Sequence, residues 1–308
     1  MPRQSKTARC IFDMTENRYI VGENSMIAPK AEPALYLVAT PIGHLADITL
    51  RALETLAGVD LIACEDTRVT RILLARYAIR KKTVSYHEHN AAEAGAKLID
   101  ILSAGKSVAL VSDAGTPLIS DPGFRLVEQA HAANIRVVPI PGAAAVITAL
   151  VASGLPTDQF FFGGFLPAKS TARRKKLEGL KTLDASLVFY ESPYRVVETL
   201  ADMTEIFGSE RQASLCRELT KTFETIHSAT LAELSAFYRD ENRPRGEIVL
   251  VIAPSDQETA TFSASEINHM LLDLAQTMPA AKAAAEAAHL TGQKKQELYA
   301  RLLSLKEK

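Results

Sequence analysis

From residue 35 onward, short apolar runs alternate with stretches whose apolar positions recur every three or four residues. The apolar runs predict five strands, at 35–39, 60–64, 83–86, 108–111 and 137–140. The stretches between them have the spacing of helices that bury one face, at 48–57, 67–77, 90–102 and 122–133. Strands that alternate with helices in this way predict a mostly parallel sheet covered on both faces.

Residue types that begin helices support two of these starts. Asn90 precedes Glu93 by three residues, which is the spacing of a capping box. Asp121 precedes Pro122, and proline is favoured in the first turn of a helix. We therefore expect Asn90 and Asp121 to cap the helices that follow them.

The alternation changes after residue 156. Strands are predicted at 160–165, 186–190, 213–216, 223–230 and 246–253, with crossover helices only at 171–183 and 195–207. Fewer crossovers favour a mixed sheet, so we expect a second α/β domain. Beyond Pro254 the chain is rich in alanine and predicts three short helices, at 266–276, 280–289 and 293–305. Thr291-Gly292 joins the last two in the manner of a helix-turn-helix.

These patterns predict an α/β protein with two α/β domains, at 34–155 and 156–255, and a small C-terminal helical segment at 263–308. Residues 1–33 show no such periodicity, and Arg3, Lys6 and Arg9 stand where a secretory signal would be apolar. We interpret 1–33 as a flexible N-terminal extension. Met26 offers a second start, so the residues before it are predicted to be dispensable.

Composition limits the location and the partners. Hydrophobic residues make up 47% of the 308, which is enough for buried cores. The three cysteines, Cys10, Cys64 and Cys216, are far apart, which argues against a disulfide framework or a structural zinc site and favours a reducing cytoplasm. The uncharged stretch 137–156 is broken by prolines and Gly142, so it is too short to cross a membrane.

Charge is balanced overall but not locally. Lys and Arg number 35 against 36 Asp and Glu, so a nucleic acid would have to bind a local basic patch. The segment 168–183 carries six cations against Glu178 alone. Such runs are usually solvated helix faces, but in a nearly neutral chain this one is a candidate for phosphate contacts.

Loops that contain proline and glycine follow three strands of the first domain, at 40–44, 112–123 and 141–145. The carboxyl ends of parallel strands meet at one edge of a sheet, where backbone amides and helix N-termini can hold a ligand. Proline and glycine also punctuate ordinary loops, but three such loops at one edge favour a ligand site. No G-x-G-x-x-G opens the first helix, which disfavours a nicotinamide oxidoreductase.

Charged residues follow several other strands. After the second strand, Asp66 either caps the next helix and pairs with Arg68 or contacts a ligand, and the sequence leaves both open. His87 and His89 have no third ligand clustered with them, so no metal site is predicted. In the second domain, the segments 191–195 and 217–221 follow strands and are natural partners for a polar substrate.

Six motifs together resemble one family. They are the segments 37–49, 63–68, 111–123, 164–167, 189–193 and 217–221. From residue 35 to its end, the chain resembles the small-subunit ribosomal RNA methyltransferase I group, the 16S rRNA (cytidine-2'-O)-methyltransferases. That group belongs to the tetrapyrrole-methylase-like, class III S-adenosylmethionine-dependent methyltransferases. The resemblance implies two α/β domains with the cofactor in the cleft between them, and a homodimer.

The resemblance also assigns S-adenosylmethionine contacts to small or apolar residues of the loops. They are Ile42, Gly43, Ala114, Gly115, Thr116, Ile119, Ala144, Ala145, Tyr190 and Leu219. The tetrapyrrole enzymes have a glycine-rich loop ending in Asp where this chain has Pro41-Ile-Gly-His44, and Gly-Asp-Pro where it has Gly115-Thr-Pro117. These departures favour RNA over a porphyrin-like substrate. A tetrapyrrole C-methyltransferase and a non-catalytic ribosome-assembly factor remain as alternatives.

The implied reaction is methyl transfer to the ribose 2'-hydroxyl of a decoding-centre cytidine, on free 16S rRNA or on the small ribosomal subunit. The protein must align the hydroxyl oxygen with the methyl group and help to remove the proton. The sequence offers six candidates for this base without choosing among them: Asp66, His87, His89, Asp113, Glu218 and Lys221. The candidates for contacts with RNA phosphates are Arg68, Arg173, Arg174, Lys175, Lys176, Arg195 and Arg217.

Overall fold

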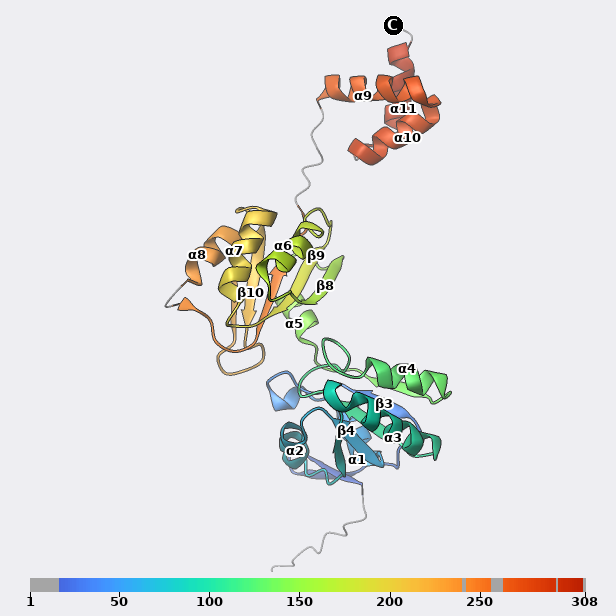
Figure 1. Cartoon of the computed structure of the whole chain (residues 1–308), viewed down its shortest axis with the longest axis vertical. Helices are drawn as coiled ribbons and strands as arrows, with labels where there is room; N and C mark the ends of the chain where they lie inside the picture. Colours follow the sequence, from blue (N-terminus) through green and yellow to red (C-terminus); the bar gives the residue numbers. More distant parts are fainter. Residues whose placement is uncertain (1–16, 240–241, 256–262, 292, 307–308) are drawn as a thin grey trace, which may run out of the picture. The chain divides into compact units, whose positions relative to one another are not determined.

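The computed structural model describes residues 17–239, 242–255, 263–291 and 293–306 (Figure 1). They divide into two compact units. The first unit contains the residues up to 178 together with 185–253, and the second contains 179–184 together with the residues after 253. The first unit holds two five-stranded sheets and the second holds three helices.

The first sheet consists of five parallel strands in the order β5-β4-β6-β3-β7. They are β3 (Leu35–Val38), β4 (Leu61–Cys64), β5 (Thr83–Ser85), β6 (Val108–Val111) and β7 (Val137–Ile140). The sheet is buried on both faces, because Ile62 packs into one apolar cluster and its neighbour Ala63 into another. The parallel sheet predicted from the alternating pattern is confirmed.

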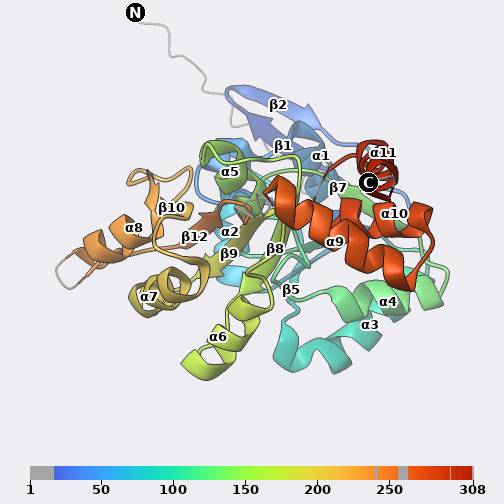
Figure 2. The ribbon, with the colours of Figure 1, turned by 90° about the horizontal axis from the view of Figure 1, so that it is seen from above.

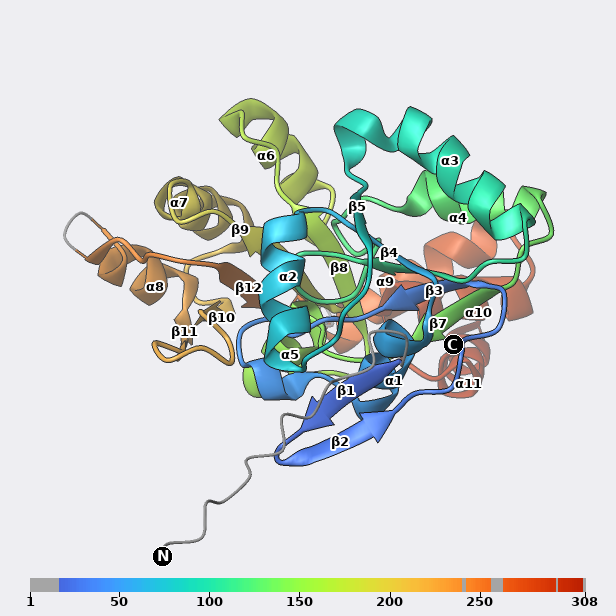
Figure 3. The ribbon, with the colours of Figure 1, turned by 90° about the horizontal axis from the view of Figure 1, so that it is seen from below.

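Helices cover both faces of this sheet. α1 (Leu50–Gly58) and α2 (Thr67–Arg76) pack on one face, and α3 (Ala91–Ser103) and α4 (Phe124–Ala132) pack on the other. Figure 3 shows α1 and α3 on opposite sides of β3. Two one-turn 3-10 helices lie in the loops: η1 (Leu45–Asp47) and η2 (Glu88–Asn90).

Of the two predicted helix caps, Asn90 lies at the N-cap position of α3 but its side chain makes no capping hydrogen bond, and Asp121 is not a cap. Asn90 Oδ1 accepts a hydrogen bond from the His87 N–H at 2.8 Å, and Glu93 forms an ion pair within its own helix. α4 begins after Gly123, whose φ of +137° suits a residue without a side chain, so Asp121 lies outside the cap position. Short polar side chains near the start of a helix can also form hydrogen bonds with nearby backbone groups, and such bonds compete with capping.

The N-terminal segment is not a flexible extension from residue 17 onward. β1 (Arg18–Val21) and β2 (Asn24–Ile27) form an antiparallel hairpin, which Figure 3 shows beside α1. Tyr19 is buried in the same apolar cluster as α1, which argues against the prediction that the residues before Met26 are dispensable. Residues 1–16, with Cys10, lie outside the described residues.

The second sheet is mixed, as the sparse crossovers predicted. Its order is β11-β10-β12-β9-β8, and only β8 and β9 are parallel. The strands are β8 (Phe160–Phe165), β9 (Ser186–Glu191), β10 (Gln212–Arg217), β11 (Thr225–Thr230) and β12 (Ile248–Ile252). The helices of this domain are α6 (Ser170–Glu178), α7 (Val196–Phe207) and α8 (Leu231–Phe237).

α5 (Ala145–Ala152) connects the two sheets. It follows β7, yet Val146 and Leu150 pack with Val188 and Val251 of the second sheet. Ile42, in the loop after β3, belongs to the same apolar cluster. The two α/β domains therefore share buried contacts, and α5 packs on the second sheet although it precedes residue 155, our predicted boundary.

The second unit is a three-helix cluster of α9 (Ala264–Thr277), α10 (Ala280–Thr291) and α11 (Lys295–Lys306) (Figure 2). Small and branched residues from all three helices, such as Leu271, Ala284 and Leu302, form its core. Ser263 caps α9 in a capping box with Glu266. Within the described residues, no helix combines the length and the apolar character needed to cross a membrane.

Candidate active site

A cavity of about 460 Å³ lies between the loops of the two sheets. Its volume is within the usual range for a small-molecule site. Nine of the ten residues expected to contact the cofactor line it: Ile42, Ala114, Gly115, Thr116, Ile119, Ala144, Ala145, Tyr190 and Leu219. They come from the loops after β3, β6 and β7 and from the ends of β9 and β10.

Backbone hydrogen bonds fix the first-domain wall of this cavity. Thr40 and Gly115 exchange two hydrogen bonds, at 2.9 and 3.0 Å, so the loops after β3 and β6 are held together. Thr116 Oγ1 donates to the Ala143 carbonyl at 3.1 Å, which adds the loop after β7. Gly115 has a φ of +81°, a conformation that glycine adopts without strain.

Gly43, the tenth residue, touches the second domain instead of the cavity. A β-carbon placed on it would lie 2.5 Å from Lys221 Cγ and 2.6 Å from Thr220 Oγ1. The adjacent His44 N–H donates to Thr220 Oγ1 at 3.1 Å. The absence of a side chain at this position lets the loop after β3 close against the loop after β10.

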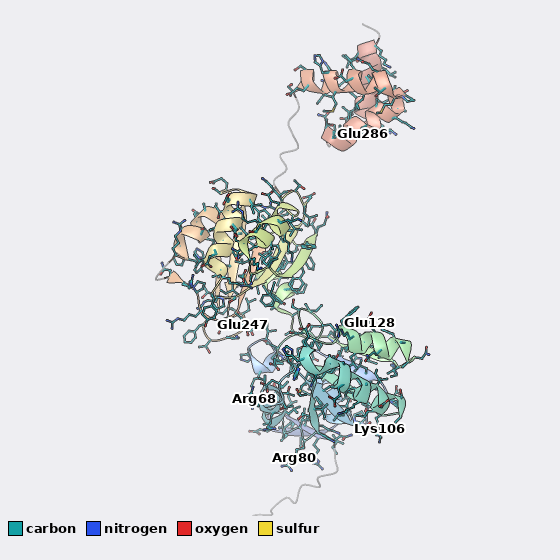
Figure 4. All side chains as sticks on the ribbon, in the orientation of Figure 1. Arg68, Arg80, Lys106, Glu128, Glu247 and Glu286 are labelled. Atoms are coloured by element: carbon teal, nitrogen blue, oxygen red, sulfur yellow. The ribbon has the colours of Figure 1, made fainter. Side chains whose placement is uncertain are left out.

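The start of β12 is the part of the cavity wall that the sequence did not reveal. Gly246 and Glu247, which precede β12, and Ile248, its first residue, line the cavity. Because β12 runs antiparallel to β9, its beginning lies beside the end of β9. The rule that ligands bind at the carboxyl ends of strands applies to parallel sheets. It therefore did not predict that the start of this antiparallel strand would line the cavity. Figure 4 shows Glu247 at the lower edge of the second domain.

Three carboxyl groups of the first domain also line the cavity: Glu65, Asp113 and Asp121. Burial raises the pKa of each above its ordinary value, and repulsion from Asp113 adds to the effect at Glu65 and Asp121. The Asp66 N–H donates to Asp113 Oδ1 at 3.0 Å, which fixes the orientation of that carboxylate. The cavity is thus an acidic site that favours a cationic ligand.

A second, more open hollow of about 440 Å³ adjoins the cavity and shares Glu65 and Asp113 with it. Its other lining residues are Asp66, Thr67, Arg68, Ser85 and His87. Two of the six candidate bases, Asp66 and His87, therefore lie beside a third, Asp113. Within the described residues, His87 Nδ1 is buried without a hydrogen-bond partner. His89 is exposed and lines neither hollow.

Asp66 is the cap of α2 and the partner of Arg68. Its carboxylate accepts from the Arg68 N–H at 2.8 Å and from the Arg68 guanidinium at 2.6 Å. These hydrogen bonds lower the pKa of Asp66 to about 2. A carboxylate with so low a pKa is a weak base, so Asp66 is disfavoured as a proton acceptor.

Lys221 and Glu218 form an ion pair at 2.9 Å, and Lys221 Nζ also contacts Glu247 at 3.0 Å. Burial would lower the pKa of Lys221, but the two carboxylates outweigh burial and raise it. Hydrogen bonds from the Glu247 N–H and from Lys221 lower the pKa of Glu218. Both shifts hold the pair in its charged form, which disfavours each residue as the base.

The basic run on α6 is mostly internal to the domain. Arg173 is buried against Asp202 at 2.7 Å, and Arg174 contacts Asp202 at 3.1 Å. Lys176 Nζ donates to a backbone carbonyl at 2.7 Å. Arg173 is therefore unavailable to a phosphate, contrary to our expectation, because α7 supplies acidic partners that lie about thirty residues away in sequence.

The other predicted RNA contacts are also partly engaged. Arg195 pairs with the buried Glu191 at 2.7 Å, and Arg217 donates to the Phe223 carbonyl at 2.8 Å. Arg68 pairs with Asp66, yet its side chain is 85% exposed. Of the three, Arg68 keeps the most surface open to a ligand.

Residues 34–235 match the family described as Tetrapyrrole (Corrin/Porphyrin) Methylases, and residues 262–306 match the RsmI C-terminal HTH domain. The chain is 57% identical over 288 residues to the ribosomal RNA small subunit methyltransferase I of Mesorhizobium japonicum, covering 94% of this chain and 97% of the relative. It is 49% identical to the protein of the same name from Vibrio cholerae, covering 93% and 97%.

Among solved structures, the fold is similar to that of a uroporphyrin-III C-methyltransferase from Thermus thermophilus complexed with S-adenosyl homocysteine. The TM-score is 0.53 at 17% identity, and the match covers 71% of this chain and 97% of that chain. At so low an identity, the likeness establishes the fold alone.

Proposed function

Since the chain belongs to the tetrapyrrole methylase family, and within it to the ribosomal RNA small subunit methyltransferase I group, we propose that it methylates 16S rRNA with S-adenosylmethionine. The acceptor is the ribose 2'-hydroxyl of a decoding-centre cytidine. The observation that carries this proposal is the 57% identity across both α/β domains and the C-terminal helices. A cytoplasmic location is part of this proposal, because the proposed substrate is ribosomal RNA.

The residues of the cavity fit S-adenosylmethionine. Small residues such as Ala114 and Ala144 let a ligand approach the backbone closely. Ile42 and Leu219 offer an apolar surface to the adenine ring of the cofactor. Asp113, Asp121 and the other carboxylates offer charge complementarity to a sulfonium and an α-amino group. When bound, this cofactor supplies a methyl group that is already activated by its positive sulfur.

We assign the removal of the hydroxyl proton to Asp113. It lines both hollows, so it lies between the cofactor cavity and the open space from which a nucleotide would enter. Its raised pKa makes it a stronger base than Asp66. With the cofactor bound, Asp113 would accept the ribose hydroxyl proton while the hydroxyl oxygen takes the methyl group, and the neutral thioether would be the leaving group.

The second hollow is where we place the target nucleotide. Arg68 lines this hollow with a side chain that is 85% exposed, so its guanidinium can approach a phosphate. His87 also lines this hollow and adds a polar side chain beside the proposed nucleotide. The homodimer implied by the family resemblance stays a prediction, which light scattering of the purified protein would test.

The decisive experiment supplies labelled S-adenosylmethionine and small ribosomal subunits from cells that lack the gene. Mass spectrometry then maps the product, and a single 2'-O-methylcytidine in the decoding centre supports the proposal. A methylated uroporphyrinogen with unmodified rRNA would favour the tetrapyrrole reaction instead. Failure to bind S-adenosylmethionine at all would favour a non-catalytic assembly factor.

A further inference from the structure

The residues from Thr67 to Lys82 form a basic segment without any carboxylate. It contains six cations, Arg68, Arg71, Arg76, Arg80, Lys81 and Lys82. The basic run at 168–183 has the same number of cations, but Glu178 lies among them. In a chain of net charge −1, this segment is therefore a strong local concentration of positive charge.

Helix geometry gathers these arginines on one exposed face. Thr70, Leu73 and Leu74 are buried, and with 3.6 residues per turn they occupy one side of α2. Arg68, Arg71 and Arg76 fall on the opposite side, where all three are exposed. Ile72, on the same side, is 65% exposed. The packing that holds α2 on its sheet thus also points its arginines outward.

These cations differ from those of α6 in their partners. Within the part of the chain that the structure describes, no carboxylate lies within 4 Å of Arg71, Arg76 or Lys82. The contact given for the Arg76 guanidinium is with an aromatic ring: its Cζ lies 6.0 Å from the centroid of the Tyr77 ring. Within the described residues, an anion that binds at Arg71, Arg76 or Lys82 therefore breaks no salt bridge, whereas Arg68 is paired with Asp66.

The arginine face is continuous with the proposed nucleotide site. The first residues of α2, Thr67 and Arg68, line the second hollow. A further hollow of about 400 Å³ at the other end of the helix is lined by Arg71, Arg80 and Lys81. Figure 4 shows Arg68 and Arg80 at opposite ends of this segment. A chain of phosphates that leaves the active site along α2 would meet cations throughout.

We propose that the exposed arginine face of α2 and the loop 77–82 bind the ribose-phosphate backbone of the RNA next to the methylated nucleotide. This inference rests on the proposed function and adds to it the surface that holds the substrate. Guanidinium groups bind phosphate oxygens through paired hydrogen bonds, and each contact releases counterions from the RNA. Neither contribution requires a particular base sequence, so this surface supplies affinity while the active site supplies selectivity.

The test removes two of these charges and measures RNA binding directly. We would compare Arg71→Gln/Arg76→Gln with Arg51→Gln/Arg125→Gln, a control that removes two exposed arginines from α1 and α4 of the same domain. Binding of the small subunit and of a 16S rRNA fragment is measured against salt concentration, without turnover. The α2 variant should bind about tenfold more weakly at physiological salt. The negative slope of log affinity against log salt should become shallower by about 1.5, because two cations are lost.

Further variants separate charge from folding. Arg71→Lys/Arg76→Lys keeps the charges and should recover most of the salt slope. The affinity for S-adenosylmethionine should match wild type in every variant, because none of these residues lines the cofactor cavity. An α2 variant with wild-type affinity and slope, or a control with an equal loss, would overturn the inference. If the wild-type protein binds RNA through this surface but transfers no methyl group to it, the proposed function would be contradicted and the inference about the surface would stand.

Discussion

The backbone N–H of His44 donates a hydrogen bond to Thr220 Oγ1 at 3.1 Å, which joins the loop after β3 to the loop after β10. The residues on either side of this contact, Ile42 and Leu219, line the proposed cofactor cavity from opposite domains. The contact therefore sets how closely the two walls approach each other. It depends on Gly43, which has no side chain to hold the loops apart.

Replacing Gly43 by alanine should weaken cofactor binding. The new β-carbon would lie 2.5 Å from Lys221 Cγ and 3.0 Å from the Leu219 carbonyl oxygen, and the backbone atom cannot rotate away. Overpacking of this kind costs about 1–3 kcal/mol, so we expect at least a fivefold rise in the Kd for S-adenosylmethionine by calorimetry. The control is Gly95→Ala in α3, where the nearest atom belongs to the flexible Gln129. Equal affinity in both variants would contradict this account.

Asp113→Asn should abolish methyl transfer while cofactor binding persists. The asparagine keeps an oxygen that accepts the hydrogen bond from the Asp66 N–H, so the loop is retained, but it cannot take a proton. Loss of a general base lowers kcat by about 10²–10⁴-fold. Single-turnover assays with saturating S-adenosylmethionine measure this effect.

The pH dependence of the wild type gives the second half of this test. Burial raises the pKa of Asp113, and the residue acts as a base only when ionised. The rate should therefore fall as the pH drops through a pKa above the ordinary aspartate value, and Asp113→Asn should lose this limb. If Glu65→Gln removed the limb and Asp113→Asn did not, the base would be Glu65.

Arg173→Met should destabilise the second domain without a specific effect on RNA binding. Arg173 Nε contacts Asp202 Oδ2 at 2.7 Å, and both side chains are nearly buried. Removing Arg173 leaves the nearly buried Asp202 carboxylate with Arg174, at 3.1 Å, as its remaining ionic partner, so the cost in the free energy of unfolding is at most the about 3–5 kcal/mol of a broken buried pair. Denaturant unfolding measures the loss. Lys175→Met, an exposed neighbour on the same helix, is the control and should unfold like wild type.

The sign of the pH effect distinguishes this ion pair from simple packing. Burial would raise the pKa of Asp202, but hydrogen bonds from Arg173 and Arg174 outweigh burial and lower it. A depressed carboxyl pKa stabilises the fold above the ordinary aspartate pKa, and this contribution is lost as the pH falls. The difference in stability between wild type and Arg173→Met should therefore shrink in acid. A constant difference across the pH range would mean that packing alone is lost.

Tyr19→Ala should destabilise the first domain although it lies outside the βα alternation. Tyr19 is buried against α1, and deletion of a buried aromatic side chain costs about 3–5 kcal/mol. Thermal unfolding followed by circular dichroism measures the loss. Ile27→Ala on β2 is the control, because Ile27 is 64% exposed and should cost little. A chain that begins at Met26 should show at least the loss seen for Tyr19→Ala.

The sequence predicted those parts of the site whose position depends only on the order of strands and helices along the chain. The loops that carry Ala114 and Ala144 could be placed because the ends of parallel strands share one edge, and the family resemblance then singled out these two residues. Glu247 could not, because its place depends on the antiparallel pairing of β12 with β9. Arg173 looked like a free cation because its partner Asp202 is brought to it only by the packing of α6 on α7. Tertiary pairing is the information that a single sequence lacks.

Lys221 offers a sharp choice between a positioning residue and a base. The ammonium group links Glu218 to Glu247, and Glu218 has a φ of +52°, so this cation holds an irregular loop against the cavity. Lys221→Met leaves the two carboxylates to repel each other. We expect a Kd for S-adenosylmethionine about tenfold higher, with kcat at saturating cofactor close to wild type. Lys106→Met, which removes a lysine paired with Asp60, is the control.

A catalytic base at Lys221 would give the opposite result. Cofactor affinity would be retained, and kcat would fall by about 10²–10⁴-fold. Lys221→Arg sharpens the contrast, since arginine preserves the positive charge but stays protonated at every accessible pH. If Lys221→Arg turns over at a rate near that of the wild type, then a positive charge at this position is sufficient and no proton transfer by Lys221 is needed. That outcome would agree with the raised pKa of Lys221, which keeps it charged beside its two carboxylates.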